Sequence, residues 1–524
     1  MRILIPAVWG GAVLTAALRF VHMLQLNAYQ TPGYLRWLSR RSGASLLRLI
    51  WASPTLLLFL WPDDRAWWIL IFFYALSAFF ARPPKKAKKP LKYTSRVIRL
   101  LATLALMLAV AGFCFWRFWP AEGGFIALPV FFFAGYFLTP IWVFLCNILN
   151  LPIQKGVEAH YISDARRRLD AHPGLIVLGL TGSYGKTSTK HFLERLLSEK
   201  YSTLITPGSY NTPMGVVRTV RERLLPTHEF FVCEMGARHV GDIKELCHIV
   251  HPQHGLITSV GEQHLETFGT LENVASTKFE LIDALPPDGM AFLNMSSAAV
   301  KNRPVSRSAL RYGISEQADG TLDYRAFDIQ AEPDGLRFTV EAPGGESLRF
   351  STSLIGRHNV ENLTAAIAVA HTFGIPLSRL SAAVKTLDPT PHRLHLLKPA
   401  QGLAIIDDAF NANPEGAHAA LEALSLFDGC KILVTPGFVE LGERQDICHE
   451  ALGRQAAGLC DYVALVGKKQ TASIARGLKA GGFPEKNLFV GDTLQEAMSF
   501  VREIPSDGQT KYVLLENDLP DNYN

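Results

Sequence analysis

The seven cysteines of this chain include no CxxC pair. A disulfide framework is therefore not expected. We expect reduced thiols in a cytosolic compartment instead. The sequence also lacks internal repeats and long low-complexity segments. The formal net charge is +5, but residues 82–96 contain seven basic and no acidic residues, which leaves the rest of the chain at −2. The chain as a whole is therefore not a basic nucleic-acid binder, and no nucleic-acid partner is expected.

Five apolar stretches with few charged residues occur before residue 150, at 3–25, 46–62, 66–81, 97–116 and 125–149. Each approaches or exceeds the ~20 residues that cross a bilayer, although the second and third are marginal and could form one hairpin. One alternative is a set of buried core helices; another is a signal sequence in the first stretch, which has no clear cleavage site. We predict that residues 1–150 form a transmembrane region of about five helices in the cell (inner) membrane.

The distribution of basic residues predicts the orientation of these helices. The Lys-rich loop 82–96 and the segment containing Arg36, Arg40 and Arg41 are expected on the cytoplasmic side. The N-terminus then lies outside, and the chain enters the cytoplasm near Asn150. All later domains are therefore predicted in the compartment that contains ATP.

Residues 174–200 combine an apolar run ending at Leu180, a glycine-rich turn and an apolar stripe of helical spacing. This order predicts a strand, a phosphate-binding loop and a helix. Lys186 would reach the terminal phosphates of ATP, and the Thr187 hydroxyl would join a Mg2+ shell. The strict GxxxxGK[ST] pattern is absent, because Leu180 stands where its first glycine is required. The loop residues expected to bind ATP are Gly182, Ser183, Gly185, Lys186, Thr187 and Ser188.

The rest of the chain predicts two α/β domains after a short charged connector at 151–173. The first, 174–388, alternates strand and helix patterns, which favours a mostly parallel sheet, and turn signals between Leu293 and Ser353 indicate added antiparallel strands. A linker, DPTP, begins at Asp388. The second domain, 389–524, again alternates and is expected to be Rossmann-like. The predicted fold class is thus an α-helical membrane bundle followed by α/β domains.

Six motifs occur in the order found in the Mur ligase family, the ATP-dependent amide-forming enzymes of cell-wall precursor synthesis, which this chain resembles. The nearest pattern is that of the family branch that adds D-alanyl-D-alanine to a UDP-muramoyl-tripeptide. The motifs are TGSYGKTS, TPGSYNTPMGV, CEMGARHVGDI, GEQHLETFGTLENVASTKFEL, GRHNVENLTAA and DDAFNANP. The resemblance covers roughly residues 175–466 and implies ATP and Mg2+ as cofactors.

Three further residues complete the expected metal site. Glu234 ends the apolar run FFVCEMGA, so its carboxylate should emerge at the carboxyl edge of the sheet beside the phosphate loop, where Mg2+ requires a ligand. His264 resembles the family histidine that binds a second Mg2+. Lys278 matches the family lysine that is carbamylated by CO2, a change that converts a cation into a metal-binding anion. A solvated strand end, a structural histidine and an exposed helix lysine remain the alternatives for these three residues.

The resemblance also assigns nucleotide contacts in both domains. Asn359 and Asn362 lie three apart at a helix start, share one face and resemble the residues that hydrogen-bond adenine. Arg393 corresponds to a family arginine that contacts the terminal phosphate when the domains close, although His392 replaces the glycine before it. Asp408 resembles the aspartate that contacts the ribose. With Lys186, His264 and Lys278, Arg393 completes the predicted catalytic group.

The loop containing Ser209, Asn211 and Thr212 matches the family loop that meets the carboxylate substrate. Two features depart from the family. A membrane region replaces the N-terminal uridine-binding domain, and the ending KYVLLENDLPDNYN lacks the usual Lys-Gly-Ser-Arg element. Both departures bear on the carboxylate and amine substrates rather than on ATP.

The sequence therefore predicts a membrane-anchored ligase for peptidoglycan or other cell-envelope precursors that forms an amide through an acyl phosphate. One alternative is a ligase for a lipid-linked or polymeric, poly-glutamate-like acceptor. Alternatives of another class are a nucleotide-gated transporter and a non-catalytic membrane scaffold for cell-wall enzymes. The expected partners are ATP, soluble or lipid-linked carboxylate and amine substrates, and the lipid bilayer.

Overall fold

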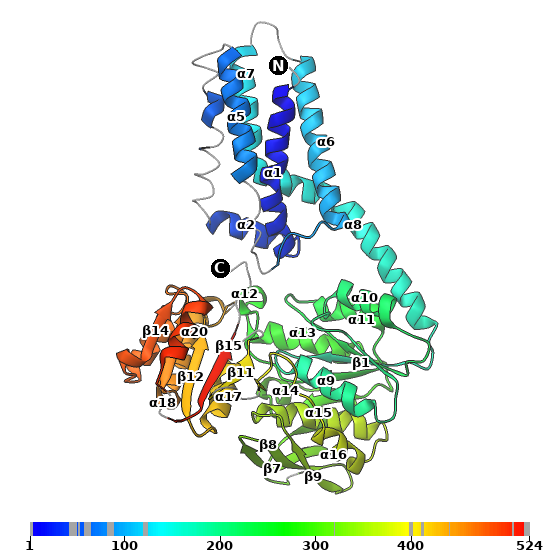
Figure 1. Cartoon of the computed structure of the whole chain (residues 1–524). Coiled ribbons are helices and arrows are strands. Elements are labelled where there is room, and N and C mark those ends of the chain that lie inside the picture. The colour runs from blue at the N-terminus through cyan, green and yellow to red at the C-terminus, as the bar shows by residue number, and fades with distance from the viewer. Residues whose placement is uncertain are drawn as a thin grey trace. The chain divides into compact units, whose positions relative to one another are not determined.

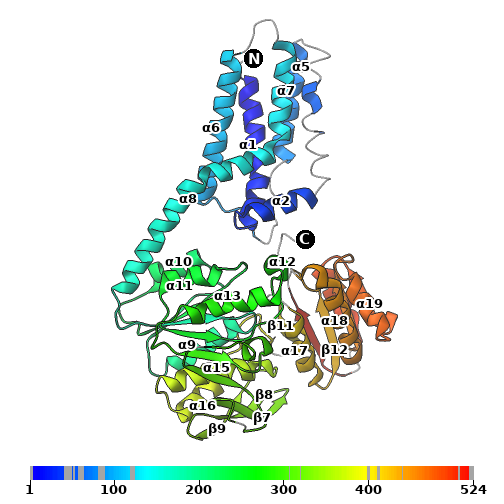
Figure 2. The ribbon, with the colours of Figure 1, turned by 180° about the vertical axis from the view of Figure 1, so that it is seen from behind.

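The computed structural model describes residues 4–40, 50, 53–56, 64–80, 89–118, 124–305, 307–318, 320–397, 402–409, 413–439, 441–505 and 508–517. The chain divides into two compact units, and the boundary along the sequence falls between His160 and Tyr161. The first is helical and the second consists of two α/β domains (Figures 1 and 2).

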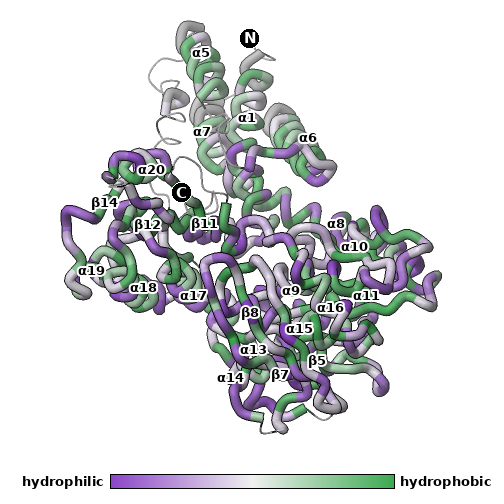
Figure 3. Tube along the Cα trace, turned by 60° about the horizontal axis from the view of Figure 1, so that its bottom comes forward, coloured by the Kyte–Doolittle hydropathy of each residue, from purple (hydrophilic) through white to green (hydrophobic). Residues whose placement is uncertain are grey.

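Helices make up the described part of the N-terminal unit. Their bounds are α1 Leu4–Leu26, α2 Thr31–Arg40, η1 Ser53–Leu56, α5 Asp64–Phe80, α6 Ser95–Phe118, α7 Gly124–Phe137 and α8 Thr139–Asp170. The apolar faces of α1, α5 and α7 pack around Trp9, whose indole nitrogen donates to the carbonyl of Phe132 at 3.0 Å. On α5 and α6, Phe72, Leu106 and Phe113 are at least 60% exposed, so apolar side chains also face outward. Much of these helices is coloured green, for hydrophobic residues, in Figure 3.

Two described helices are long and apolar enough to cross a membrane, in the segments Ala7–Leu26 and Ser95–Phe113. A third span results if Val130–Phe137 and Thr139–Asp170, which meet at a bend of 66°, are counted as one. Trp68–Phe80 is apolar but shorter, and most of the predicted stretch 46–62 lies outside the described residues. The region of about five membrane helices thus remains a prediction. The predicted connector is mostly helical, because α8 continues to Asp170.

The central domain is built on a sheet with the order β2-β3-β1-β4-β5-β6-β7-β8-β9. Its strands are β1 Ile176–Thr181, β2 Thr203–Ile205, β3 Phe230–Glu234, β4 His254–Ile257, β5 Ala291–Asn294, β6 Ala309–Ile314, β7 Tyr324–Glu332, β8 Gly335–Glu341 and β9 Ser347–Thr352. Its helices are α9 Lys186–Leu197, α10 Pro213–Arg223, α11 Asp242–Val250, α12 Leu265–Phe268, α13 Leu271–Asp283, α14 Ala298–Lys301, α15 His358–Thr372 and α16 Leu377–Lys385. Apolar side chains from both faces of the sheet form two separate cores.

Strand direction in this sheet agrees only in part with the prediction. β1 to β7 pair in parallel, whereas β8 and β9 are antiparallel to their neighbours. The turn signals at Pro333 and Pro343 do join the β7-β8 and β8-β9 hairpins, as expected. β6 pairs with β7 in parallel, so these two strands are not antiparallel as predicted.

The C-terminal domain contains a second sheet with the order β10-β11-β15-β12-β13-β14, in which only β10 is antiparallel to its neighbour. Its strands are β10 His395–Leu396, β11 Leu403–Asp408, β12 Cys430–Thr435, β13 Tyr462–Val466, β14 Leu488–Gly491 and β15 Lys511–Glu516. Its helices are α17 Pro414–Ser425, α18 Gln445–Leu459, α19 Ala472–Ala480 and α20 Leu494–Glu503. Two acidic residues of the candidate active site, Asp408 and Glu516, lie at the carboxyl ends of β11 and β15.

Candidate active site

The phosphate loop connects β1 to α9 as predicted. Gly182 and Gly185 have φ angles of 150° and 79°. A Cβ atom at Gly182 would lie 2.0 Å from Thr258 Oγ1, and one at Gly185 would lie 2.2 Å from Asn362 Oδ1. Both positions therefore require glycine, and the loop keeps its backbone N–H groups at the start of α9.

Lys186 is the first residue of α9 and folds back over the loop. Its Nζ donates to the carbonyls of Gly182 at 2.5 Å and Ser183 at 3.0 Å. Burial, together with the guanidinium of Arg393, lowers the pKa of Lys186 to about 8, although the Glu234 carboxylate acts in the opposite direction. Its two acceptors are neutral carbonyls, so a polyphosphate would be a stronger partner for this ammonium.

Glu234 ends β3 beside this loop, and its side chain is buried. Its carboxylate accepts hydrogen bonds from Lys190 Nζ at 2.8 Å and Asn211 Nδ2 at 3.1 Å, and the Thr187 hydroxyl lies 3.4 Å from both of its oxygens. Burial alone would raise the pKa of Glu234, but Lys190 and Lys186 outweigh burial and lower it below its ordinary value. The structure therefore holds an ionised carboxylate next to the phosphate loop.

Lys278 lies on the inner face of α13 and is 2% exposed. Burial and the positive charge of Lys186 lower the pKa of Lys278 well below its ordinary value, which favours a neutral amine. An exposed helix lysine is thus excluded. His264 precedes α12 with a φ angle of 54°, in the left-handed region that few non-glycine residues adopt, and its carbonyl accepts from the N–H groups of Thr267 and Phe268.

Arg393 brings the C-terminal domain to this site. Burial lowers its pKa, while the carboxylates of Asp408, Glu234 and Glu516 act to raise it. Arg393 is also close enough to lower the pKa of Lys186. Arg393 therefore lies among acidic groups of both domains. An ion pair between the domains joins Arg444 to Glu262.

Asp408 and Glu516 are register partners at the carboxyl ends of β11 and β15. The Leu394 N–H donates to Asp408 Oδ1 at 3.0 Å, and Glu516 is fully buried. Burial, and then the charge of Asp408, raises the pKa of Glu516 well above its ordinary value. Burial also raises the pKa of Asp408. The pair therefore favours taking up a proton, since two adjacent buried carboxylates repel each other.

The predicted adenine and loop residues form protein contacts. Asn362 Oδ1 accepts from Thr189 Oγ1 at 3.2 Å, and Asn359 Nδ2 donates to the carbonyl of Ile355 at 2.8 Å. Asn362 thus lies against the phosphate-loop helix, on the same face of α15 as Asn359. Ser183 Oγ lies 3.1 Å from both the carbonyl and the N–H nitrogen of Gly261, and Ser188 is buried on α9.

The predicted acceptor loop leads into α10. Asn211 reaches the Glu234 carboxylate, whereas Ser209 and Thr212 are exposed. Among the described residues, no group of three or more His, Cys, Asp or Glu side chains could hold a metal ion by itself. Glu234 and Thr187 nevertheless fit Mg2+, which commonly takes one or two protein oxygens and completes its shell with phosphate and water.

Sequence reasoning missed two buried ionisable residues of this site. Lys190 lies within residues 174–200, four residues after Lys186, but nothing in its spacing separates it from an exposed helix lysine. Its complete burial beside Glu234 depends on the β3 strand packing over α9. Glu516 ends an apolar strand as Glu234 does, and that strand-end position was the available signal.

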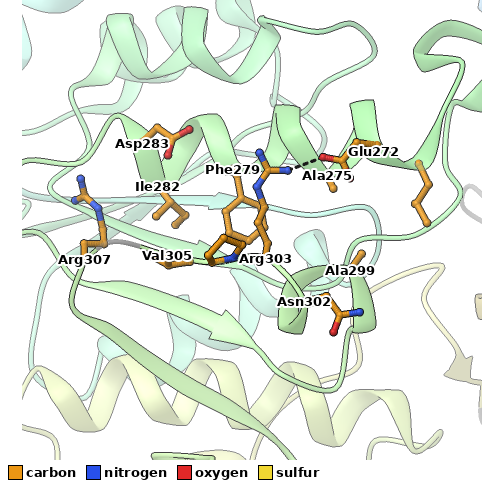
Figure 4. Close-up of a pocket in the computed structure, with 12 residues that line it drawn as sticks. Glu272, Ala275, Phe279, Ile282, Asp283, Ala299, Asn302, Arg303, Val305 and Arg307 are labelled. Carbon is orange, nitrogen blue, oxygen red and sulfur yellow. Dashed lines mark hydrogen bonds and ion pairs between the residues drawn. The ribbon is translucent and has the colours of Figure 1, made fainter.

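A separate pocket of about 740 Å³ lies between α13 and the segment after α14, and none of the predicted site residues line it. Its walls include Ala275, Phe279 and Val305 (Figure 4). Arg303 pairs there with Glu272 at 3.1 Å and lies over the Phe279 ring, 4.9 Å from its centroid. The pocket is thus distinct from the phosphate site.

Two family models match this chain. The Mur ligase middle domain matches residues 180–370, and the Mur ligase glutamate ligase domain matches residues 392–514. The second match ends two residues before Glu516. Together the matches include every predicted site residue.

Named relatives and solved structures agree with the domain matches. The UDP-N-acetylmuramoyl-tripeptide--D-alanyl-D-alanine ligase of Escherichia coli is 35% identical over 299 residues, covering 56% of this chain and 65% of that protein. The Bacillus subtilis ligase of the same name is 33% identical, covering 53% and 60%. This chain therefore spans less than two thirds of the length of these relatives.

Two solved structures of MurF are also similar. A crystal structure from Acinetobacter baumannii has a TM-score of 0.62 and 28% identity, covering 70% of this chain and 78% of that one. The structure of MurF from Thermotoga maritima in complex with ADP has a TM-score of 0.60 and 28% identity, covering 69% and 80%. The likeness thus extends from sequence to fold in both α/β domains.

Proposed function

Since this chain belongs to the Mur ligase family, whose members are ATP-dependent amide ligases, we propose that it joins a carboxylate to an amine in cell-wall precursor synthesis. The observation that carries the proposal is the convergence of Lys186, Thr187 and Glu234 at the carboxyl edge of the central sheet. Arg393 reaches the same place from the second domain.

The proposed reaction has two steps. A carboxylate oxygen of the acceptor attacks the γ-phosphorus of ATP, which breaks the bond to ADP and forms an acyl phosphate. The amine then attacks the acyl carbon, phosphate leaves, the amine loses a proton to solvent, and an amide results. This route requires no covalent bond to the enzyme.

Each residue contributes binding or charge to these steps. Lys186 exchanges its two carbonyl acceptors for the β- and γ-phosphate oxygens, and Arg393 neutralises charge on the transferring phosphoryl group. When bound, Mg2+ neutralises phosphate charge, and Thr187 and Glu234 are the residues that would hold it. Asn359, Asn362 and Asp408 are proposed to bind the nucleoside, while Ser209, Asn211 and Thr212 meet the acceptor.

Lys278 is proposed to be carbamylated. A neutral amine is the form that attacks CO2, and the burial and lowered pKa of Lys278 favour that form. Addition of the neutral amine to CO2 releases one proton to solvent, and the product would carry one negative charge where the amine carried none, close to Lys186. His264 is proposed to act with this group at a second metal.

We propose that the protein is anchored in the cell membrane with its ligase domains in the cytoplasm. The two candidate spans and the exposed apolar side chains of α5 and α6 support this arrangement. They also favour a second candidate function, ligation of a lipid-linked acceptor.

An isotope experiment tests the proposed chemistry. Turnover with an acceptor whose carboxylate carries 18O is expected to place one 18O atom in the released phosphate. Phosphate released without 18O during amide formation would contradict the acyl-phosphate route. Parallel reactions with UDP-muramoyl-tripeptide and with lipid-linked precursors would distinguish the two candidate functions.

A further inference from the structure

Lys190 lies on α9, one turn after the phosphate loop, and its side chain is completely buried. Lysine is almost never fully buried unless it is paired. This lysine contacts neither solvent nor, in the proposed reaction, ATP. Its position therefore calls for a role other than binding the nucleotide.

Two acceptors from different segments surround the ammonium group of Lys190. Its Nζ donates to Glu234 Oε2 at 2.8 Å, at the end of β3, and to the carbonyl of Gly208 at 2.6 Å, in the proposed acceptor loop. The other carboxylate oxygen of Glu234 accepts from Asn211 Nδ2, in the same loop, at 3.1 Å. One buried cation thus joins the nucleotide helix, the proposed metal ligand and the acceptor loop.

These contacts fix the orientation of the Glu234 carboxylate. Each oxygen has one donor, and the Thr187 hydroxyl is equidistant from both at 3.4 Å. The Thr187 hydroxyl, with which Glu234 would share a metal ion, therefore lies within reach of both carboxylate oxygens. Without Lys190, Glu234 would be a buried charge with fewer partners, and it would reorient or take up a proton.

We propose that Lys190 is a positioning residue that orients Glu234 for the metal and couples metal-nucleotide binding to the order of the acceptor loop, residues 206–212. The inference deepens the proposed function and rests on it. Lys190 itself touches no reacting atom. It acts through the Glu234 carboxylate on one side and the Gly208 carbonyl on the other.

The first test measures binding rather than turnover. Mn2+·ADP binding to the full-length, detergent-solubilised protein is followed by the electron paramagnetic resonance of Mn2+, with hydrogen exchange measured at residues 206–212. We expect Lys190→Met to weaken Mn2+·ADP binding at least about 10-fold. Mn2+·ADP should slow exchange in the wild-type loop but not in the variant.

Lys511→Met is the matched control. Lys511 is also buried and donates from Nζ to the carbonyls of Val501 and Arg502, both at 3.2 Å, and no carboxylate of the described residues pairs with it. This variant should lose stability without losing Mn2+·ADP affinity. Equal Mn2+·ADP affinity in wild type, Lys190→Met and Lys511→Met would show that Lys190 is only structural, and would overturn the inference.

A double variant keeps the test valid if Lys190→Met does not fold. Lys190→Met combined with Glu234→Gln removes both charges, so no unpaired charge is buried. Because Lys190 acts on the metal through Glu234, this variant should bind Mn2+·ADP as Glu234→Gln does, within about twofold. Binding of Mn2+·ADP 10-fold weaker in the double variant than in Glu234→Gln would contradict the proposal that Lys190 acts through Glu234. Wild-type protein that binds Mn2+·ADP but ligates no acceptor would refute the proposed function and leave the role of Lys190 in metal binding intact.

Discussion

Two buried glutamates end strands at the carboxyl edges of the two sheets, but their pKa values are shifted in opposite directions. Glu234 ends β3 in the central domain and Glu516 ends β15 in the C-terminal domain, and they are 1% and 0% exposed. The pKa of Glu234 is lowered, whereas the pKa of Glu516 is raised well above its ordinary value. Burial alone therefore does not determine the charge of a strand-end carboxyl group in this protein.

The difference comes from the neighbours of each group. Glu234 has Lys190, Lys186 and the amide of Asn211, all of which favour the charged form. Glu516 has the carboxyl group of Asp408, which opposes ionisation, and only Arg393 favours it. The carboxyl edge of the central sheet thus favours the negative charge that a metal ion requires, while the carboxyl edge of the C-terminal sheet favours a protonated carboxyl group.

The largest effect is expected from Lys186→Met, which removes the cation that would hold the terminal phosphates. ATP-dependent ligation should fall about 10³-fold or more, in line with losses of a charge-stabilising group in phosphoryl transfer. Lys200→Met, at an exposed lysine just beyond the same helix, is the control and should keep full activity. A Lys186→Met protein with wild-type turnover would contradict the role given to the loop.

Glu234→Gln should have the next largest effect, because it keeps the shape of the side chain and removes its charge. We expect turnover to fall about 10²- to 10³-fold and the Mg2+ requirement to shift to higher concentration. A Mg2+ titration of initial rates measures both effects. Glu229→Gln, at an exposed glutamate just before β3, is the comparison variant and should leave the titration unchanged.

Arg393→Met tests whether the two domains act together. Its guanidinium is proposed to stabilise the transferring phosphoryl group, so kcat should fall about 10²-fold while ADP affinity changes little. Kinetics with saturating substrates and a separate ADP titration would distinguish these effects. An exposed arginine of α18, Arg454, provides the control Arg454→Met. Equal losses in kcat and ADP affinity would instead indicate simple nucleotide binding.

The smallest expected effect is a gain in stability from Glu516→Gln. Because the folded protein holds this proton more tightly than the unfolded chain does, its stability falls as pH rises from about 4.5 through the raised pKa. Replacement by glutamine should therefore stabilise the protein by about 1–2 kcal/mol at pH 8 and by less at pH 5. Chemical unfolding at both pH values measures the difference. Destabilisation at pH 8 would show that the charge of Glu516 is required.

The residues at the carboxyl edge of the central sheet could be predicted because they follow recognisable sequence patterns. The strand, glycine turn and helix around Lys186 are contiguous, and Glu234 directly follows an apolar strand. At the carboxyl edge of the sheet in the C-terminal domain, only Arg393 and Asp408 were predicted, and both by resemblance to the family. Glu516 lies where the sequence departs from the family, and its raised pKa depends on β15 pairing beside β11, a contact between residues about a hundred positions apart.

Long-range packing also explains the other differences from prediction. Local patterns could not reveal the burial of Lys190, which results from β3 lying over α9, or the parallel pairing of β6 with β7. Hydropathy identified apolar stretches before residue 150, but helix length limits the described candidate spans to two, or three with the bent pair. The membrane topology, the domain limits and the assigned site roles remain predictions.

The most direct measurement is product formation by the detergent-solubilised full-length chain supplied with ATP, Mg2+, an acceptor carboxylate and an amine. Mass spectrometry would identify the amide while phosphate release is followed in the same reaction. We expect one phosphate per amide, dependence on both substrates, and loss of both products in Lys186→Met. ATP hydrolysis without an amide, across UDP-linked, lipid-linked and polymeric acceptors, would contradict the assignment of this chain as a ligase.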